Sequence, residues 1–235
     1  MKKINIKGAC LGVFISLVLS GCNYSKTEIK QILNKQLEEH ASEHGIPAQS
    51  LVVLRNEEVL FKGVHGTTEI SNKILIDENS VFPIYSVTKL FASTLVSQLI
   101  EEGQLKLSDP ISKYLTDLPE HWRNIRLEQL LNHTSGLPEY FQCSEQQCEF
   151  PESAEIGIQS LKDVPLTFTP DSQMRYNQTN YLLLKLIVEN TTKTPYKELI
   201  ASRILRPFGL NSTWFSINDV PKDRLVKSYH AGLGI

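Results

Sequence analysis

The sequence has 235 residues, of which 41% are hydrophobic, with 24 Lys and Arg against 26 Asp and Glu. This composition is typical of a globular protein with enough apolar side chains for a sizeable core, and it excludes collagen-like and low-complexity chains. A net charge of −2 without runs of like charge gives no electrostatic footprint for nucleic acid, so we expect no nucleic-acid partner.

The N-terminus carries the features of a secretory signal. Three lysines in the first seven residues precede an uncharged apolar run over residues 11–19. The run is too short to cross a bilayer comfortably, so it predicts a signal peptide over residues 1–21 rather than a membrane-spanning helix. It ends in Leu-Ser-Gly-Cys22, which resembles a bacterial lipobox. Such a motif implies that Cys22 becomes the lipidated N-terminus and anchors the chain to a membrane.

A lipid anchor predicts a location in the cell envelope. Because Asn23 rather than Asp follows Cys22, we expect the periplasmic face of the outer membrane if the source is Gram-negative.

Cys143 and Cys148 enclose a polar segment, and an oxidising compartment allows a disulfide in such a loop. A zinc pair is the alternative, but no second Cys or His pair lies nearby to complete four ligands, so no metal is expected.

An amphipathic helix is predicted over residues 26–44, because its apolar residues recur at helical spacing. A β-hairpin should follow, since two apolar runs, residues 51–54 and 59–61, flank a short polar turn. The glycines at positions 63 and 66 are expected to end the second strand.

The strongest predicted helix runs from Ser86 to Glu102, and Gly103 should end it. One side of this helix is expected to carry an apolar stripe made of Leu90, Phe91, Leu95, Leu99 and Ile100.

The following part of the chain is predicted to be mainly helical, from about residue 104 to residue 200. Short helices punctuated by Pro should occupy residues 109–133, and a polar, irregular stretch residues 134–170. A buried helix is expected over residues 181–188 and another helical segment over 195–210. The pattern does not alternate strands and helices, so it does not predict a parallel sheet.

Ser86-Val-Thr-Lys89 is the segment most suggestive of chemistry. Residues three apart share a helix face, so the Lys89 amine can reach the Ser86 hydroxyl. A serine hydroxyl becomes a good nucleophile when a neighbouring base takes its proton, and a lysine can be that base if burial lowers its pKa. On the motif alone an N-cap serine followed by a surface lysine is the better interpretation, because a chance match is expected in a chain of this length.

Three longer stretches change that interpretation. Residues 76–110 contain the Ser-x-x-Lys motif, residues 127–137 read LEQLLNHTSGL, and residues 176–184 begin with Tyr-Asn-Gln. Together, over roughly residues 45–230, they resemble the serine β-lactamase-related family, which includes class C β-lactamases, D-alanyl-D-alanine carboxypeptidases and related esterases.

The resemblance implies an α/β fold of the α+β type, β-lactamase/transpeptidase-like, in which helices flank an antiparallel sheet beside a mainly helical subdomain. It makes Ser86 the nucleophile, Lys89 its base and Tyr176 a proton relay to the leaving group. Water would then hydrolyse the acyl-enzyme. The resemblance implies neither a metal nor an organic cofactor. His133 is interpreted as a packed structural residue rather than a base.

Two departures from the family accompany this resemblance. The family's substrate-binding Asn aligns with Gln178, which offers the same amide on a longer stem. Family members also continue with further strands, one of which carries Lys-Thr-Gly or His-x-Gly. His230-Ala-Gly232 has these letters but follows Tyr176 too soon, so we interpret it as coincidence. The domain, residues 22–235, is therefore expected to be incomplete at its C-terminus and to lack the C-terminal strands.

Two functional hypotheses follow. The first is a lipid-anchored envelope serine hydrolase whose substrates are amides or esters, such as β-lactams, D-Ala-containing peptidoglycan peptides or small esters. The second is a truncated, catalytically inactive envelope lipoprotein that binds peptidoglycan or a protein partner. The hypotheses differ in whether Ser86 becomes acylated.

Overall fold

The structure, a computed structural model, describes residues 24–71, 74–143 and 148–229. The predicted signal peptide, Cys22 and the His230-Ala-Gly232 stretch lie outside these residues. The chain divides into two compact units, the first reaching to Phe82 and including Pro221–Lys227, the second spanning Pro83–Val220. Among the described residues, no helix combines the length and the apolar character needed to cross a membrane.

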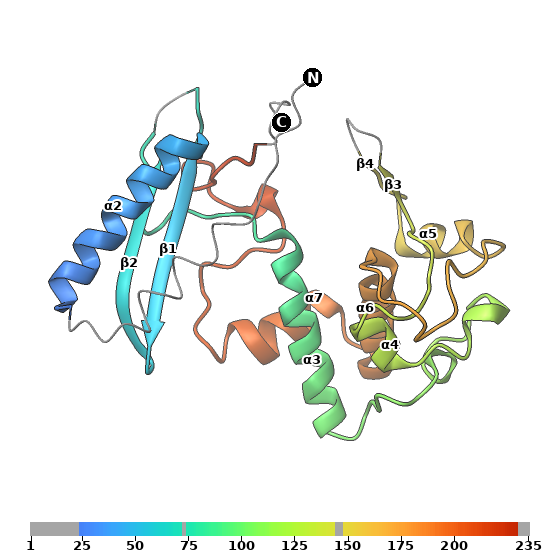
Figure 1. Cartoon of the computed structure of the whole chain (residues 1–235). Helices are drawn as coiled ribbons and strands as arrows, with labels where there is room; N and C mark the ends of the chain where they lie inside the picture. The colour runs from blue at the N-terminus through green and yellow to red at the C-terminus, as the bar shows by residue number, and fades with distance from the viewer. Residues whose placement is uncertain (1–23, 72–73, 144–147, 230–235) are drawn as a thin grey trace. The chain divides into compact units, whose positions relative to one another are not determined.

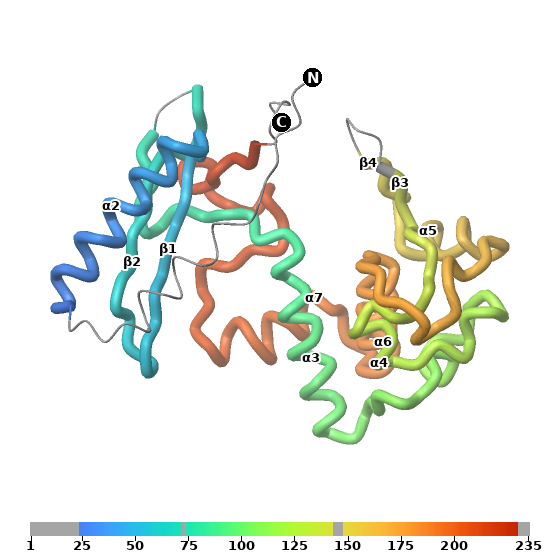
Figure 2. The backbone as a smooth tube through the Cα atoms, viewed as in Figure 1, coloured from blue at the N-terminus to red at the C-terminus, as the bar shows by residue number. Residues whose placement is uncertain are grey.

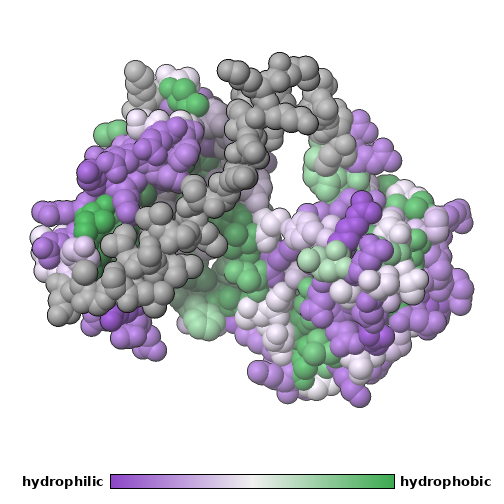
Figure 3. Space-filling model, in the orientation of Figure 1, coloured by the Kyte–Doolittle hydropathy of each residue, from purple (hydrophilic) through white to green (hydrophobic). Residues whose placement is uncertain are grey.

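Helix α2, Lys26–His44, confirms the first predicted helix. Ser25 caps its N-terminus, because the Ser25 hydroxyl accepts a hydrogen bond from the Glu28 amide while the Glu28 carboxylate accepts one from the Ser25 amide. Gly45 ends the helix in the left-handed conformation at φ +62°. Hydrophilic side chains predominate on the visible face of α2 (Figure 3).

Strands β1, Ala48–Arg55, and β2, Glu58–Gly66, form the predicted antiparallel hairpin. α2 covers one face of this hairpin (Figure 1), where Leu33, Leu37 and Phe61 are buried together. The expectation that Gly63 helps to end β2 is wrong, because the strand continues to Gly66. A Cβ at Gly63 would lie 2.4 Å from the Phe61 ring, so the glycine makes room for this ring.

The predicted helix from Ser86 is two elements. A 3₁₀ turn, η1, spans Tyr85–Thr88, and helix α3 spans Lys89–Glu101. The predicted stripe is wrong at Leu90, whose exposed fraction is 66%. The helix instead turns Ala92, Leu95, Val96 and Leu99 inward, a spacing that follows its 3.6-residue period.

Short helices punctuated by Pro follow α3, as predicted. They are η2 Ile111–Lys113, η3 Glu120–Trp122 and α4 Leu127–Leu131. Further helical elements are α6 Gln178–Thr192, α7 Tyr196–Ile200, the π-helical turn η4 Ala201–Leu205 and η5 Ile217–Asp219. α4 and α6 lie side by side although they are distant in the sequence (Figure 2), and Trp122, Leu183 and Ile187 are fully buried in the core of this unit.

The stretch from residue 134 to 170 is less irregular than predicted. It contains helix α5, Ala154–Ser160, which begins where the Ser153 hydroxyl accepts a hydrogen bond from the Ile156 amide. It also contains a short antiparallel pair, β3 Gln142–Cys143 with β4 Cys148–Glu149, in which Cys143 and Cys148 are opposite each other. Cys148 is disulfide-bonded, while the Cys143 side chain lies outside the described residues.

Candidate active site

Ser86 lies in the 3₁₀ turn η1, immediately before α3, and is exposed to solvent. The preceding residue, Tyr85, has φ +43°, in the left-handed region that residues with a Cβ rarely adopt. In a 3₁₀ turn residues three apart are eclipsed, so the side chain of Lys89 lies next to that of Ser86.

Lys89 is the first residue of α3 and is half-buried. Its Nζ donates to Ser86 Oγ at 3.3 Å and to Gln178 Oε1 at 2.6 Å. The same ammonium group lies 4.7 Å from the ring centroid of Tyr176 and 5.3 Å from that of Tyr181, within reach of a cation–π interaction. Lys89 therefore joins the start of α3 to the start of α6.

Tyr176 and Gln178 are on either side of the N-cap of α6. The cap is Asn177, whose Oδ1 accepts from the Asn180 amide and whose Nδ2 donates to the Leu137 carbonyl at 3.0 Å. From this position the Tyr176 hydroxyl donates to Ser86 Oγ at 2.7 Å. The structure thus brings together the side chains of Ser86, Lys89, Tyr176 and Gln178, all within the second unit.

The electrostatic surroundings favour the ionised form of Tyr176. Partial burial raises the pKa of its phenol, but interactions with Lys89, Ser86 and Gln178 outweigh that effect and hold the pKa below its ordinary value of 10.0. A phenol with a lowered pKa exchanges a proton with a bound group more readily near neutral pH.

His133 lies beside these residues in the loop that follows α4. Its ring centroid is 4.7 Å from that of Tyr176 and 5.3 Å from that of Tyr181, and its Nδ1 accepts from the Asn177 amide. Burial and the nearby charge of Lys89 lower the pKa of this imidazole. The contacts fit the predicted packed residue, but they place it directly against Tyr176.

Glu139 is a further residue of the site that the sequence did not indicate. Its two carboxylate oxygens accept from the backbone N–H of Gln178, at N···O distances of 3.1 and 3.0 Å, in the first turn of α6. A carboxylate at a helix N-terminus is stabilised by the unpaired amides and the helix dipole. Glu139 belongs to no periodic or capping pattern in the sequence, so only the folded chain reveals the contact.

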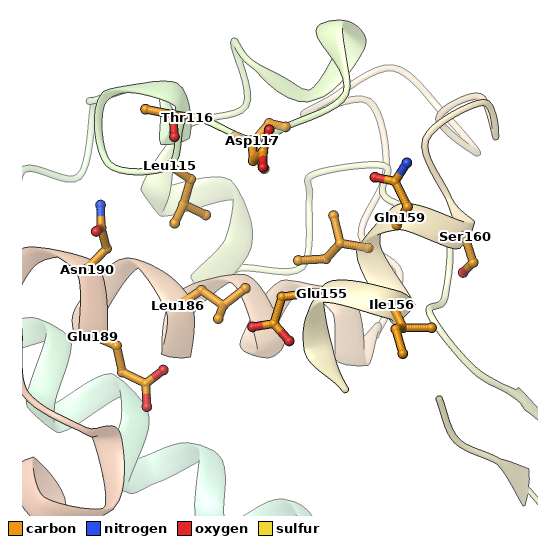
Figure 4. A pocket seen from close by; sticks show the side chains of 12 residues that line it. Leu115, Thr116, Asp117, Glu155, Ile156, Gln159, Ser160, Leu186, Glu189 and Asn190 are labelled. Carbon is orange, nitrogen blue, oxygen red and sulfur yellow. The ribbon is translucent and has the colours of Figure 1, made fainter. Parts of the chain in front are cut away.

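A cavity of about 920 Å³ lies elsewhere in the second unit. It is lined by side chains from residues 115–118, from α5 and from α6, and it combines apolar residues such as Leu115 and Leu186 with the carboxylates of Asp117, Glu155 and Glu189 (Figure 4). None of the four predicted catalytic or substrate-binding residues lines it. Among the residues that the structure describes, no three His, Cys, Asp or Glu side chains gather as a metal site.

The arrangement around Ser86 matches what nucleophilic catalysis requires. A hydroxyl has two proton-transferring groups within hydrogen-bond distance, one amine and one phenol, and it is exposed to solvent where a carbonyl compound can approach. Residues 33–233 match the family model described as beta-lactamase. The chain belongs to the beta-lactamase family.

Curated relatives in this family are similar over most of the present chain. Protein flp of Staphylococcus aureus (strain N315) is 26% identical over 209 residues, which are 87% of this chain and 41% of the relative. A putative D-alanyl-D-alanine carboxypeptidase of Salmonella agona is 26% identical over 190 residues, which are 73% of this chain and 44% of the relative. The chain thus spans less than half the length of these relatives.

Similar solved structures confirm the predicted β-lactamase/transpeptidase-like fold. The D-amino acid amidase from Ochrobactrum anthropi SV3 superposes with a TM-score of 0.72 at 28% identity, covering 82% of this chain and 54% of its own. The octameric penicillin-binding protein homologue from Pyrococcus abyssi superposes with a TM-score of 0.71 at 24% identity, covering 83% of this chain and 47% of its own.

Proposed function

We propose that this protein is a serine hydrolase that cleaves amide or ester bonds through an acyl-enzyme on Ser86. The contact of both Tyr176 Oη, at 2.7 Å, and Lys89 Nζ, at 3.3 Å, with Ser86 Oγ carries the proposal. Membership of a hydrolase family supports it.

The geometry suggests how the protons move. Lys89 takes part in this step as an uncharged amine. As Ser86 Oγ bonds to the substrate carbonyl carbon, the Ser86 proton passes to Lys89 Nζ, which becomes an ammonium ion. When the tetrahedral intermediate collapses, the bond to the leaving amine or alcohol breaks, and Tyr176 gives that group a proton that Lys89 replaces. Water then attacks the acyl-serine, releases the acid and returns the proton to Ser86.

Amides of D-amino acids are the substrate class that we infer. Two relatives support it by their names, a D-alanyl-D-alanine carboxypeptidase and a D-amino acid amidase. Gln178 would orient the substrate through its amide, which in the unliganded site accepts from Lys89. β-Lactams and small esters present the same electrophilic carbonyl and belong in the same assay.

Covalent labelling of the full chain tests the proposal. A fluorophosphonate and a fluorescent penicillin should label the wild-type protein, and Ser86→Ala should abolish labelling without loss of fold. A panel of D- and L-alanyl anilides should then show faster release from the D compounds. Labelling that survives Ser86→Ala would exclude Ser86 as the nucleophile. A folded wild-type protein that neither probe labels would contradict the hydrolase proposal and favour the inactive, ligand-binding alternative.

We also propose that the protein is anchored in the cell envelope by a lipid on Cys22. The support is the lipobox-like sequence and the apolar run before it. In cells grown with radiolabelled palmitate, wild type should incorporate the label and sediment with membranes, whereas Cys22→Ala should do neither. Unchanged fractionation and labelling of Cys22→Ala would remove the anchor.

A further inference from the structure

His133 holds the Tyr176 segment from both sides. The His133 carbonyl accepts the Arg175 amide at 2.9 Å, and its Nδ1 accepts the Asn177 amide at 3.2 Å. Between these two contacts the Tyr176 ring lies 4.7 Å from the imidazole, centroid to centroid. The residue before Tyr176, the residue after it and its own ring therefore all contact the same histidine.

The surrounding hydrogen bonds determine which imidazole nitrogen carries the proton. The Ser135 hydroxyl accepts from the Leu137 amide at 3.2 Å and donates to Asn180 Oδ1 at 2.6 Å. That bond directs the Asn180 Nδ2 group toward His133 Nδ1, 3.0 Å away. Nδ1 thus accepts from two N–H donors, the Asn180 side-chain amide and the Asn177 backbone amide. A proton on Nδ1 would point at both donors, so Nδ1 is the unprotonated nitrogen. The imidazole is neutral and carries its proton on Nε2.

The loop that presents His133 is itself fixed. Thr134 Oγ1 donates to Asp171 Oδ1 at 3.0 Å, and the Asp171 amide donates to the Thr134 carbonyl at 2.9 Å. Gln129 of α4 donates to the other carboxylate oxygen of Asp171 at 2.7 Å. A side chain held on such a rigid base can position a neighbour to within a fraction of an ångström.

Charges near the imidazole oppose its protonation. The ionisable groups that face it are Lys89 from α3, Tyr176 and Tyr181, and the Lys89 ammonium lies against the same two tyrosine rings as the imidazole. A second positive charge beside Lys89 would be repelled, and a proton on Nδ1 would meet two donors instead of two acceptors.

We propose that His133 is a positioning residue whose neutral imidazole holds the Tyr176 hydroxyl on Ser86, and that a proton on Nδ1 releases this hold. The inference rests on the proposed function, because it assigns Tyr176 a part in acylation. It adds a residue, a defined tautomer and an acid sensitivity to that site.

Two variants separate positioning from packing. In His133→Asn the side-chain oxygen can replace Nδ1 as an acceptor and does not protonate in this pH range. In His133→Phe the ring and its packing stay, but the acceptor is lost. The readouts are the acylation rate as a function of pH and the pKa of Tyr176, followed by ¹³Cζ-tyrosine NMR with Tyr176→Phe for assignment.

We expect His133→Asn to keep the pKa of Tyr176 below 10 and to acylate at nearly the wild-type rate, without the wild-type fall below pH 6.5 that is due to His133. His133→Phe should move the pKa of Tyr176 toward 10 and slow acylation by about 10²-fold, the usual effect of a misplacement near 1 Å. Equal behaviour of the two variants in both readouts would overturn the proposal.

The NMR measurements do not depend on turnover, so they distinguish failure of this inference from failure of the hydrolase proposal. If the wild type is not acylated but the pKa of Tyr176 differs between the variants as expected, only the hydrolase proposal fails. If His133→Phe does not fold, ¹⁵N NMR of histidine-labelled wild type decides, with His133→Asn for assignment. A protonated Nδ1 near neutral pH would overturn the proposal, and an unprotonated Nδ1 would support it.

Discussion

Tyr85 has a positive φ in the residue that directly precedes Ser86. A non-glycine residue in this conformation costs of order 1–3 kcal/mol, and such strain persists only where the surrounding structure holds it in place. Here it coincides with a 3₁₀ turn that leaves Ser86 exposed while its hydroxyl receives two hydrogen bonds. The strained backbone is thus part of how the chain presents Ser86, the proposed nucleophile.

Lys89→Ala should slow acylation of Ser86 by about 10²–10⁴-fold, because it removes the group that takes the serine proton in the proposed mechanism. The measurement is the rate constant of probe labelling at saturating probe, with the exposed Lys162→Ala as the matched loss of a charge. An unchanged rate for Lys89→Ala would remove this residue from the mechanism.

Helix α3 shows how far periodicity predicts an element. The apolar spacing correctly indicates a helix with Leu95 and Leu99 buried, but it also assigns Leu90 to the buried side. Leu90 precedes Leu99 by nine residues, or two and a half helical turns, so it lies on the opposite side of the helix from the buried Leu99. A hydrophobic pattern gives the period of a helix, and the elements packed against the helix decide which side is buried.

Leu99 and Leu90 allow a paired test of this point. Leu99→Ala should lower the free energy of unfolding by about 2–5 kcal/mol, because the side chain is fully buried and its loss leaves a cavity. Leu90→Ala should change it by less than about 0.5 kcal/mol. Urea denaturation measures both, and equal losses would place Leu90 in the core.

Gly136 in the loop after His133 should tolerate no side chain. Its φ is +73°, and an added Cβ would lie 2.1 Å from the Phe168 carbonyl oxygen. Gly103 has nearly the same φ, +72°, but no atom within 4 Å of such a Cβ. Gly103→Ala should therefore cost about 1–2 kcal/mol for the backbone conformation alone, and Gly136→Ala distinctly more. Chemical denaturation compares them, and equal costs would mean that the loop moves away from Phe168 freely.

The candidate active site belongs entirely to the second compact unit, whose core includes residues of α3, α4 and α6. The first unit is a hairpin covered by α2 with a small core of its own. The arrangement of the proposed catalytic side chains therefore depends on helix packing within the second unit, in which α3 supplies Lys89 and the start of α6 supplies Tyr176 and Gln178.

Stability of the whole molecule should fall as the pH drops below 6.5. Burial first and Lys89 second hold the pKa of His133 below 6.5 in the folded chain, so the unfolded chain binds this proton more readily in that window. His133 therefore contributes stability that is fully present above its unfolded pKa of about 6.5. This contribution is lost as the pH falls from 6.5 through the lower pKa of the folded chain. Denaturation midpoints over this range should decline more for wild type than for His133→Asn, and parallel declines would assign the effect to other groups.

The sequence alone determined the helix at 26–44, the hairpin and the order of the family motifs. It also predicted a helix over residues 86–102, of which residues 89–101 are α-helical. Periodicity, capping and turn signals act over a few residues, so a linear sequence carries them fully. It also supplied the candidates Ser86, Lys89 and Tyr176.

Only the tertiary structure decided what these residues contact. Tyr176 and Ser86 are 90 residues apart, and their hydrogen bond exists because α3 packs against α6. The tautomer of His133, the contact of Glu139 with the first turn of α6 and the exposure of Leu90 likewise depend on side chains brought together from distant segments. Such contacts follow from packing and from the satisfaction of buried polar groups, which no local pattern encodes.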